Sequence, residues 1–182
     1  MSSNPPDGTA GLLARWGFSR AGWLDNRRGE WWLAAQLLLI AALLLPPLPP
    51  PAALGLAWPM ALRLLGAALV ALALLLALQS FLRLGSSLTP LPDPIPGAPL
   101  VTEGPYAHCR HPLYRAVLIG ALGMAVLLGS LLHLLLLLAL AGVLGGKARR
   151  EEEGLAAAHP GYAAYRAATP AIVPFLPWLD WR

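Results

Sequence analysis

The stretch LYRAVLIGALGMAVLLGSLLHLLLLLALAGVL, residues 113 to 144, is an almost uninterrupted apolar run. Gly129 and Ser130 divide it into two segments of about sixteen residues each, somewhat shorter than the ~20 residues of a typical membrane helix. Two apolar helices joined by so short a break form a tight hairpin, and we expect one here. Small residues at helix-face spacings, such as Gly120 and Gly123, favour close helix packing.

Two further apolar segments precede this hairpin. Residues 64–82 are interrupted only by Gln79 and Ser80 and are followed at once by Arg83, which makes them the clearest membrane span. Residues 31–45 begin with two tryptophans, a residue type that favours the membrane interface. A run of prolines after residue 45 ends this segment, because proline lacks the backbone donor that a helix needs.

The composition indicates an integral membrane protein. Of the 182 residues, 57% are apolar and 12% are charged, so the charged surface that a soluble fold requires is missing. We predict a single all-α membrane domain with about four transmembrane helices, the last two forming the hairpin. Along the chain, residues 1–30 form an interfacial N-terminus, 31–84 two spans, 85–112 a cytoplasmic loop, 113–146 the hairpin and 147–182 a cytoplasmic helical segment.

Basic residues collect at one end of the predicted helices. With four spans, all but Arg63 fall on one side, namely Arg15, Arg20, Arg27, Arg28, Arg83, Arg110, Arg115, Lys147, Arg149, Arg150, Arg166 and Arg182. The positive-inside rule predicts that this side, with both termini, is cytoplasmic. Richness in Leu, Ala, Pro and Arg favours a bacterial inner membrane. The pI near 9.8 thus reflects topology rather than nucleic-acid binding, and no obligate protein partner is indicated.

The stretch GPYAHCRHPLY, residues 104–114, is the best candidate for chemistry, because polar and ring-bearing side chains interrupt an apolar chain. Pro112 suits the first turn of a helix, so the side chains before it lie at a helix N-terminus. Such an end attracts electron-rich groups through its unpaired amides and partial positive charge. Taken alone, Arg110, His111 and Tyr114 are explained equally well as anchors at lipid headgroups.

Metal and thiol chemistry are disfavoured in this stretch. The spacing of His108, Cys109 and His111 matches no common zinc pattern, and we predict no metal site. Cys109 is the only cysteine, so an intramolecular disulfide is excluded. We expect Cys109 to pack as a small apolar side chain rather than to act as a nucleophile.

A cluster of charges follows the hairpin at residues 147–153. Taken alone it is typical of a solvated helix surface with local ion pairs. Glu151, Glu152 and Glu153 point in directions about 100° apart on a helix, so at least one can face the protein. An inward glutamate would suit ribose hydroxyls or a cationic ligand. Because the charges place this cluster on the same side as residues 104–114, we expect the two segments to converge.

Several short motifs occur in a fixed order. They are Leu-Thr-Pro at 88–90, Leu-Val-Thr-x-Gly-Pro-Tyr at 100–106, Arg-His-Pro-Leu-Tyr at 110–114, Glu-Glu-x-x-Leu at 151–155, then Tyr162, Tyr165 and the later prolines. This ordered set resembles isoprenylcysteine carboxyl methyltransferases and the related phospholipid methyltransferases over residues 85–177. The resemblance implies a multi-span fold that binds S-adenosylmethionine between the last hairpin and the C-terminal segment and transfers its methyl group.

The resemblance also implies roles for single residues. Its motif positions imply cofactor binding by Tyr106, His111, Pro112, Leu113, Tyr114 and one or both of Glu151 and Glu152. Catalytic positions near the substrate are implied for Arg110, His111 and Arg149, with Arg150 as the alternative to Arg149. Which of the three adjacent glutamates faces the cofactor stays open.

Departures from the family pattern concern the acceptor more than the cofactor. Ala107 replaces a basic residue that often follows Gly-Pro-Tyr, and Arg115 and Ala116 replace a small residue and a glycine. His159, Pro160 and Gly161 replace the usual Phe-Gly before the first tyrosine. We expect a lipidic or small apolar acceptor from the bilayer, methylated on a carboxylate, hydroxyl, amine or thiol.

The atom that accepts the methyl group stays open. A carboxylate is already ionised near neutral pH, and Arg110 could orient it through paired hydrogen bonds. The other acceptors must lose a proton, for which His108, His111 and Tyr114 are candidate relays.

One competing hypothesis also stays open, namely a non-enzymatic membrane scaffold or transport component. Transport is disfavoured because no charged residue lies at mid-membrane depth.

Overall fold

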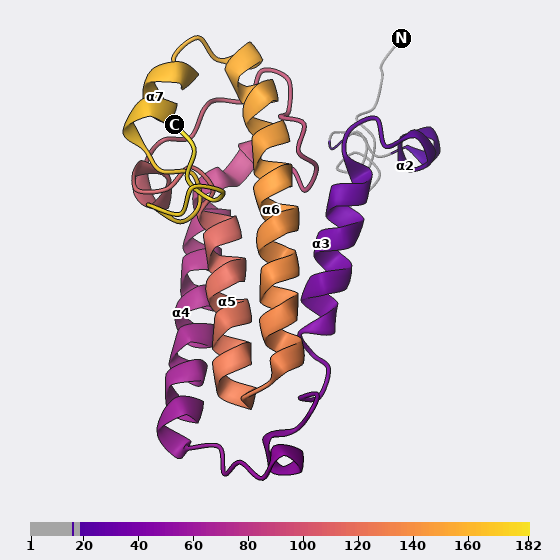
Figure 1. The fold of residues 1–182 in the computed structure, drawn as a ribbon. Helices are drawn as coiled ribbons and strands as arrows, with labels where there is room; N and C mark the ends of the chain where they lie inside the picture. Colours follow the sequence, from indigo (N-terminus) through magenta and orange to yellow (C-terminus); the bar gives the residue numbers. More distant parts are fainter. Residues whose placement is uncertain (1–15, 17–18) are drawn as a thin grey trace, which may run out of the picture.

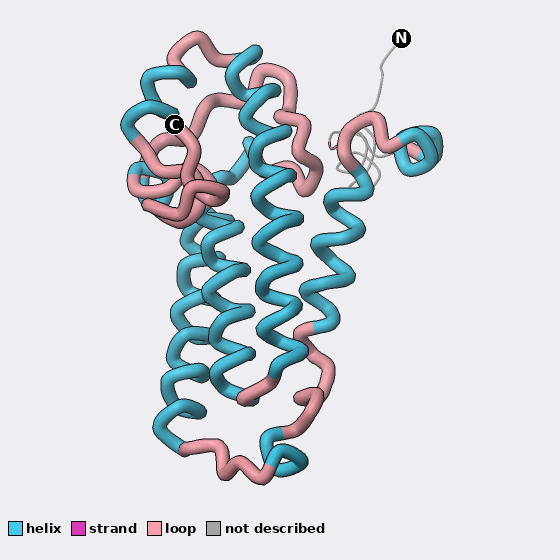
Figure 2. The backbone as a smooth tube through the Cα atoms, in the orientation of Figure 1, coloured by secondary structure: helices cyan, strands magenta, loops and turns pink. Residues whose placement is uncertain are grey.

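The computed structural model describes Trp16 and residues 19–182. Its α-helices are α2 (Arg20–Asp25), α3 (Glu30–Ala42), α4 (Met60–Leu84), α5 (Pro112–Leu128), α6 (Leu131–Ala158) and α7 (Tyr162–Ala168), and its 3-10 helices are η1 (Pro51–Leu54), η2 (Gly85–Ser87) and η3 (Gly104–Ala107). The described part of the chain contains no β-strand (Figure 2), which confirms the all-α prediction. The predicted interfacial N-terminus, residues 1–30, lies largely outside the described residues.

The helices α3, α4, α5 and α6 lie side by side and alternate in direction (Figure 1). The helix α4 packs mainly on α5, and α6 packs on both α5 and α3. Since α4 and α6 run toward the end that carries α7 and the C terminus, the loop after α4, the start of α5 and the end of α6 all meet there. That shared end holds every polar motif that the sequence singled out.

Two of these helices, α4 and α6, are long and apolar enough to cross a membrane. Much of the α4 surface consists of exposed leucines, namely Leu64, Leu65, Leu72, Leu74, Leu75, Leu78 and Leu82. An apolar surface of this extent suits lipid rather than water. The apolar helices α3 and α5 are shorter, at 13 and 17 residues, so the expected total of four spans stays a prediction.

The break between α5 and α6 falls where the sequence predicts it. Gly129 adopts a left-handed conformation with φ of 59°, which glycine tolerates because it has no Cβ. The Ser130 side chain accepts a hydrogen bond from the backbone N–H of His133 and caps α6. The helix α6 then continues to Ala158, so the charged residues after 146 extend the second arm of the hairpin without a break.

The helix α3 is tied to the hairpin at its far end. It ends at Ala42 rather than at Leu45. The backbone N–H groups of residues 43–45 donate to carbonyls three residues back, in a tighter turn than an α-helix, and Pro46 then disfavours helical geometry at the residue before it. The imidazole of His133 lies 2.8 Å from Ser130 Oγ and 3.1 Å from the carbonyl oxygen of Leu43. These contacts hold the end of α3 against the start of α6.

The last residues of the chain, 169–182, fold back over the start of α5 and the end of α6. The backbone N–H groups of Arg110 and His111 donate to the carbonyls of Pro170 (2.9 Å) and Ala171 (3.0 Å). Apolar residues of this C-terminal tail join the same buried cluster as α5 and α6. The tail thereby links residues 104–114 to the charged part of α6, which confirms the predicted convergence of these two segments.

Candidate functional site

Arg110 and Glu152 form a buried ion pair where the motif loop, residues 85–111 between α4 and α5, meets α6. Arg110 Nε donates to Glu152 Oε1 at 2.8 Å, and Arg110 Nη2 donates to Glu152 Oε2 at 3.3 Å. Glu152 Oε1 also lies 2.9 Å from His111 Nε2, and Glu152 Oε2 accepts from the indole N–H of Trp181 at 2.8 Å. Arg110 also donates to the carbonyl of Arg166 in α7 and to the tail carbonyls of Thr169 and Trp181. Since the two side chains are 1% and 3% exposed, this network fixes loop, helix and tail together.

Glu151 belongs to a second and more open set of polar atoms. Pro112 occupies the first turn of α5, so His111 and Tyr114 project from the start of that helix. The Tyr114 hydroxyl donates to Glu151 Oε2 at 2.9 Å, and His111 Nδ1 lies 3.6 Å from the same oxygen. The rings of His111 and Tyr114 stack with centroids 5.3 Å apart. Glu151 is 25% exposed, so its carboxylate is available to a ligand.

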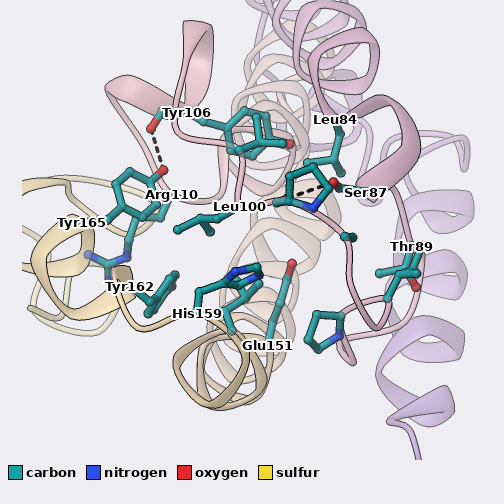
Figure 3. A pocket seen from close by; sticks show the side chains of 16 residues that line it. Leu84, Ser87, Thr89, Leu100, Tyr106, Arg110, Glu151, His159, Tyr162 and Tyr165 are labelled. Atoms are coloured by element: carbon teal, nitrogen blue, oxygen red, sulfur yellow. Dashed lines mark hydrogen bonds between the residues drawn. The ribbon is translucent and has the colours of Figure 1, made fainter.

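Beside Glu151 lies a cavity of about 70 Å³, which we name the outer chamber. Figure 3 shows Tyr162 and Tyr165 of α7 on one side of it and Ser87 and Thr89 on the other, with Glu151 between them. Further residues of its wall are mostly apolar, including Pro94, Ile95, Leu100 and Leu155. The outer chamber therefore combines aromatic and apolar walls with one carboxylate.

A second cavity of about 280 Å³, the inner chamber, lies between α3, α5 and α6. Its polar wall includes Gln36, His111, Tyr114, Lys147 and Glu151. Five residues line both chambers, namely Leu84, Thr89, Tyr106, Arg110 and Glu151. The two chambers therefore adjoin.

An apolar groove of about 280 Å³ continues from the inner chamber along α3, α4 and α5. Ala77 and Val117 line both spaces. The rest of the groove is lined only by apolar residues, among them Ile40, Leu74 and Met124. A molecule with an apolar chain could therefore reach the polar inner chamber from the apolar helix surface.

Burial controls the ionisation of the side chains around the outer chamber. It raises the pKa of Tyr106 and of Tyr165 above the usual range for tyrosine, and Glu151 raises the pKa of Tyr106 further. The Tyr165 hydroxyl donates to the backbone carbonyl of Tyr106 at 2.6 Å. These phenols therefore keep their protons, and they serve as walls and donors rather than as bases.

Comparison with known proteins identifies the family. Residues 61–159 match the family described as phospholipid methyltransferase, which is more than half of the chain. The chain belongs to the phospholipid methyltransferase family. This family is part of the isoprenylcysteine carboxyl methyltransferase-like group of membrane methyltransferases, as the motifs predicted.

Two curated relatives of this phospholipid methyltransferase family member carry other names. A cobalt-zinc-cadmium resistance protein of Cupriavidus metallidurans is 45% identical over 78 residues, which cover 42% of this chain and 36% of that protein. A nickel-cobalt-cadmium resistance protein of Alcaligenes xylosoxydans xylosoxydans is 38% identical over 78 residues, covering 42% of this chain and 37% of that protein. The match spans little more than a third of each relative's length. No solved structure matches the chain.

The structure brings most of the predicted site residues of this family member to one place. Lining one or both chambers are Tyr106, Arg110, His111, Leu113, Tyr114 and Glu151. Pro112 is buried at the start of α5, and Glu152 is buried in the Arg110 network. Arg149 lies on the side of the tail, where it donates to the carbonyl of Trp178 and stacks over the ring of Trp181. Its predicted role beside the substrate stays a prediction.

The histidine and cysteine that precede Arg110 are placed away from the chambers. His108 is exposed in a separate recess beside Arg115. The Cys109 thiol is buried and donates to the carbonyl of Ala171 at 3.2 Å. Burial raises the pKa of the Cys109 thiol to about 11, so it carries no thiolate near neutral pH.

Sequence reasoning missed two polar residues of the inner chamber, Gln36 and Lys147. Gln36 is a lone amide within the apolar segment 31–45, and a polar residue in such a segment is a recognised signal for function. Lys147 was grouped with the solvated charges that follow it. Only the packing of α6 against α3 distinguishes Lys147 from these neighbours.

Proposed function

We propose that this chain transfers a methyl group from S-adenosylmethionine to a lipidic or small apolar acceptor at the cytoplasmic face of a bacterial inner membrane. One observation carries the proposal: the outer chamber adjoins an inner chamber that opens on an apolar groove. A polar cofactor and an apolar acceptor need opposite surroundings. The outer chamber with Glu151 and the apolar groove beyond the inner chamber offer such surroundings.

The side chains of the outer chamber match S-adenosylmethionine in their chemistry, and the chamber has to widen from about 70 Å³ to enclose the whole cofactor. Apolar residues and the rings of Tyr162 and Tyr165 suit a purine. The carboxylate of Glu151 suits ribose hydroxyls or the positive charges of the cofactor, since hydrogen bonds to an ionised group are the stronger ones. Aromatic faces such as that of Tyr106 attract a cation.

Methyl transfer requires mainly that the methyl donor and the acceptor are positioned correctly. When bound, S-adenosylmethionine supplies a methyl group whose carbon bonds to the acceptor atom while the carbon–sulfur bond breaks and leaves its electron pair on sulfur. The protein has to hold both partners in line and exclude water. The Arg110–Glu152 pair holds residues 104–111 on α6, and so keeps His111 and Tyr114 in the wall of the inner chamber.

Titration calorimetry on detergent-purified protein tests cofactor binding. We expect S-adenosylmethionine to bind, and we expect Glu151→Gln to weaken that binding about tenfold or more because a charge-assisted hydrogen bond is lost. The matched control is Glu153→Gln, which removes the same charge from an exposed position two residues away. If the folded wild-type protein binds no S-adenosylmethionine, the proposed function is wrong.

A turnover assay separates the enzyme from the competing scaffold hypothesis. Purified protein is incubated with methyl-labelled S-adenosylmethionine and a bacterial lipid extract. We expect label to enter the lipid fraction. Lability of the product to base then distinguishes a methyl ester from an ether or an N-methyl group. Cofactor binding without label transfer to any lipid fraction would favour the scaffold.

A further inference from the structure

A recess lies between α4, η3 and the start of α5, apart from the two chambers. Its volume is about 470 Å³, and its wall includes Leu76, Gln79, His108, Pro112 and Arg115. None of the residues of this wall lines the outer chamber, the inner chamber or the apolar groove. We call this space the α4–α5 recess. The proposed methyl transfer makes no use of it.

The guanidinium of Arg115 is only partly satisfied by the protein. Its Nε donates to the carbonyl oxygen of Ile172 at 2.6 Å, which is its one hydrogen bond within the described part of the chain. The Nη2 group is buried and has no acceptor there. Buried polar groups are normally hydrogen-bonded. Because a guanidinium carries five N–H donors, most of those of Arg115 remain for a ligand.

The wall of the recess contains no carboxylate that could pair with Arg115. Glu103, just before η3, is bonded to Arg83 at 2.9 Å, and Asp180 of the tail lies 3.0 Å from Arg182. No ion pair within 4.0 Å among the described residues includes Arg115. This cation also stands in the first turn of α5, where the helix dipole disfavours a positive charge. A bound anion would relieve both conflicts.

The apolar surface beside the recess favours an anion that belongs to a lipid. Leu72, Leu75 and Gln79 share one face of α4, because they follow one another at three- and four-residue spacings. On α5, Leu122 lies two turns beyond Arg115. All three of these leucines are exposed. An apolar strip on each helix therefore leads from the recess away from the end that carries α7.

The tail that contacts Arg115 suits the same depth in the membrane. Two aromatic side chains of the tail, Phe175 and Trp178, are exposed to solvent. Exposed tryptophans are typical of the membrane interface. The bond from Arg115 to Ile172 ties this part of the tail to the recess. Apolar helix surface on one side and exposed aromatic rings on the other suit the level of the lipid headgroups.

We propose that the α4–α5 recess binds the phosphate of an anionic membrane phospholipid. Arg115 is its main donor. Gln79 and His108, whose side chains are exposed at the recess, can donate further hydrogen bonds to the phosphate oxygens. The acyl chains would lie along the apolar strips of α4 and α5. The lipid binds as a lasting ligand rather than as a methyl acceptor, because the recess shares no wall with the chambers. This inference goes beyond the proposed function and does not rest on it.

The chemistry of the headgroup predicts an order of affinity. Phosphatidylglycerol has a net negative charge and an open phosphate. Phosphatidylethanolamine adds an ammonium, which finds no carboxylate in the wall of the recess and is repelled by Arg115. Diacylglycerol has no phosphate at all. We therefore expect phosphatidylglycerol to bind most tightly and diacylglycerol most weakly.

Native mass spectrometry of the delipidated full-length protein in detergent measures this order. Dioleoyl-phosphatidylglycerol, dioleoyl-phosphatidylethanolamine and dioleoylglycerol are titrated separately. We expect the first phosphatidylglycerol to bind about tenfold or more tightly than dioleoylglycerol, the difference that a charge-assisted hydrogen bond provides. Excess glycerophosphate should not displace it, because the acyl chains add to the affinity. Equal binding of the three lipids, tightest binding of phosphatidylethanolamine, or displacement by glycerophosphate would overturn the inference.

Variants then assign the preference to Arg115. We expect Arg115→Gln to abolish the preference for phosphatidylglycerol over dioleoylglycerol, and Arg115→Lys to retain it because the charge is kept. The matched control, Arg27→Gln, removes one positive charge from an exposed site at the same end of the molecule and should leave the preference unchanged. An unchanged preference in Arg115→Gln would overturn the inference.

A second position keeps the test decisive if Arg115→Gln does not fold. Gln79 is exposed, so Gln79→Ala should fold as the wild type does. We expect this variant to bind phosphatidylglycerol about threefold more weakly, since one hydrogen bond to the phosphate is lost. Wild-type affinity of Gln79→Ala, with Arg115→Gln unfolded, would count against the site.

Calorimetry separates the lipid site from the proposed cofactor site. Arg115→Gln should leave the affinity for S-adenosylmethionine unchanged. Loss of that affinity with the lipid preference intact would show that Arg115 serves the cofactor instead. If the wild-type protein prefers phosphatidylglycerol through Arg115 but binds no S-adenosylmethionine, the proposed methyl transfer is wrong and the lipid site stands.

Discussion

At the scale of the residue, three consecutive glutamates have three different environments. Glu151 faces the chambers, Glu152 is buried, and Glu153 is exposed. The helical twist of α6 separates them by about 100° per residue. The tail decides which direction is buried, because Trp181 and the tail carbonyls converge on the Arg110–Glu152 pair.

We predict that Glu152→Gln destabilises the protein by about 3 kcal/mol, since removing one partner of a buried ion pair leaves the other charge uncompensated. Arg110 would be left buried with carbonyls as its only firm partners. The measurement is thermal or denaturant unfolding in detergent. Glu153→Gln, the exposed neighbour, should change stability by less than about 0.5 kcal/mol.

A second pair of variants makes this prediction specific. If the loss comes from the unpaired charge, Arg110→Met combined with Glu152→Met should be less destabilised than the sum of the two single changes. Additive losses would show that the two side chains act independently. Equal stability of Glu152→Gln and wild type would mean that the pair does not hold the loop on α6.

At the scale of the element, α4 and α5 approach each other through glycine. A Cβ on Gly123 would lie 2.9 Å from the carbonyl oxygen of Gly66 and 2.9 Å from the backbone nitrogen of Val70. Both neighbours are backbone atoms and cannot move aside cheaply. The small residues that the sequence predicts for packing thus serve the contact with α4, not only the hairpin itself.

We therefore predict that Gly123→Ala destabilises the helix bundle by about 1–3 kcal/mol, the usual effect of overpacking. The matched control is Gly142→Ala on α6, where an added Cβ meets nothing within 4 Å. That change should be neutral or slightly stabilising, because alanine has the higher helix propensity. Thermal unfolding of both variants in one detergent gives the comparison, and equal midpoints would contradict it.

Element boundaries show what sequence can and cannot predict. The break at Gly129 and Ser130 is local, since a left-handed glycine and a serine cap act on their own turn, and it was predicted. The end of α6 was also readable from His159 and the residues after it. The length of α3 was overestimated, because the apolar pattern continues through Leu45 although the helix does not.

At the scale of the whole molecule, the sequence predicts those features of the candidate site that follow from the topology of the helices. Antiparallel helices bring residues 104–114 beside the glutamates, and six of the predicted residues line the chambers. The inward position of Lys147 was not predictable, because it depends on which face of α6 packs against α3. The hydrogen bond from Trp181 to Glu152 was equally unpredictable, since an irregular tail has no periodic sequence pattern.

The last prediction concerns orientation in the membrane. Basic residues gather at the end with α7, while Arg63 lines a recess with Pro51 and Ala52 of η1, which lies at the opposite end. The positive-inside rule then places α7 in the cytoplasm and η1 outside. Cysteines introduced singly at exposed sites, Ala53→Cys in η1 and Ala167→Cys in α7, test this with a membrane-impermeant maleimide on bacterial cells.

The native cysteine should not react with the maleimide in the folded protein, so it does not interfere with this experiment. Cys109 is 1% exposed and its pKa is about 11, so the unsubstituted protein should react only after denaturation. We expect Ala53→Cys to react in intact cells and Ala167→Cys to react only after permeabilisation. The reverse pattern would invert the orientation and place the chambers outside the cytoplasm, away from the cellular supply of the proposed methyl donor. Labelling of both sites in intact cells would contradict the crossing of the membrane by α4.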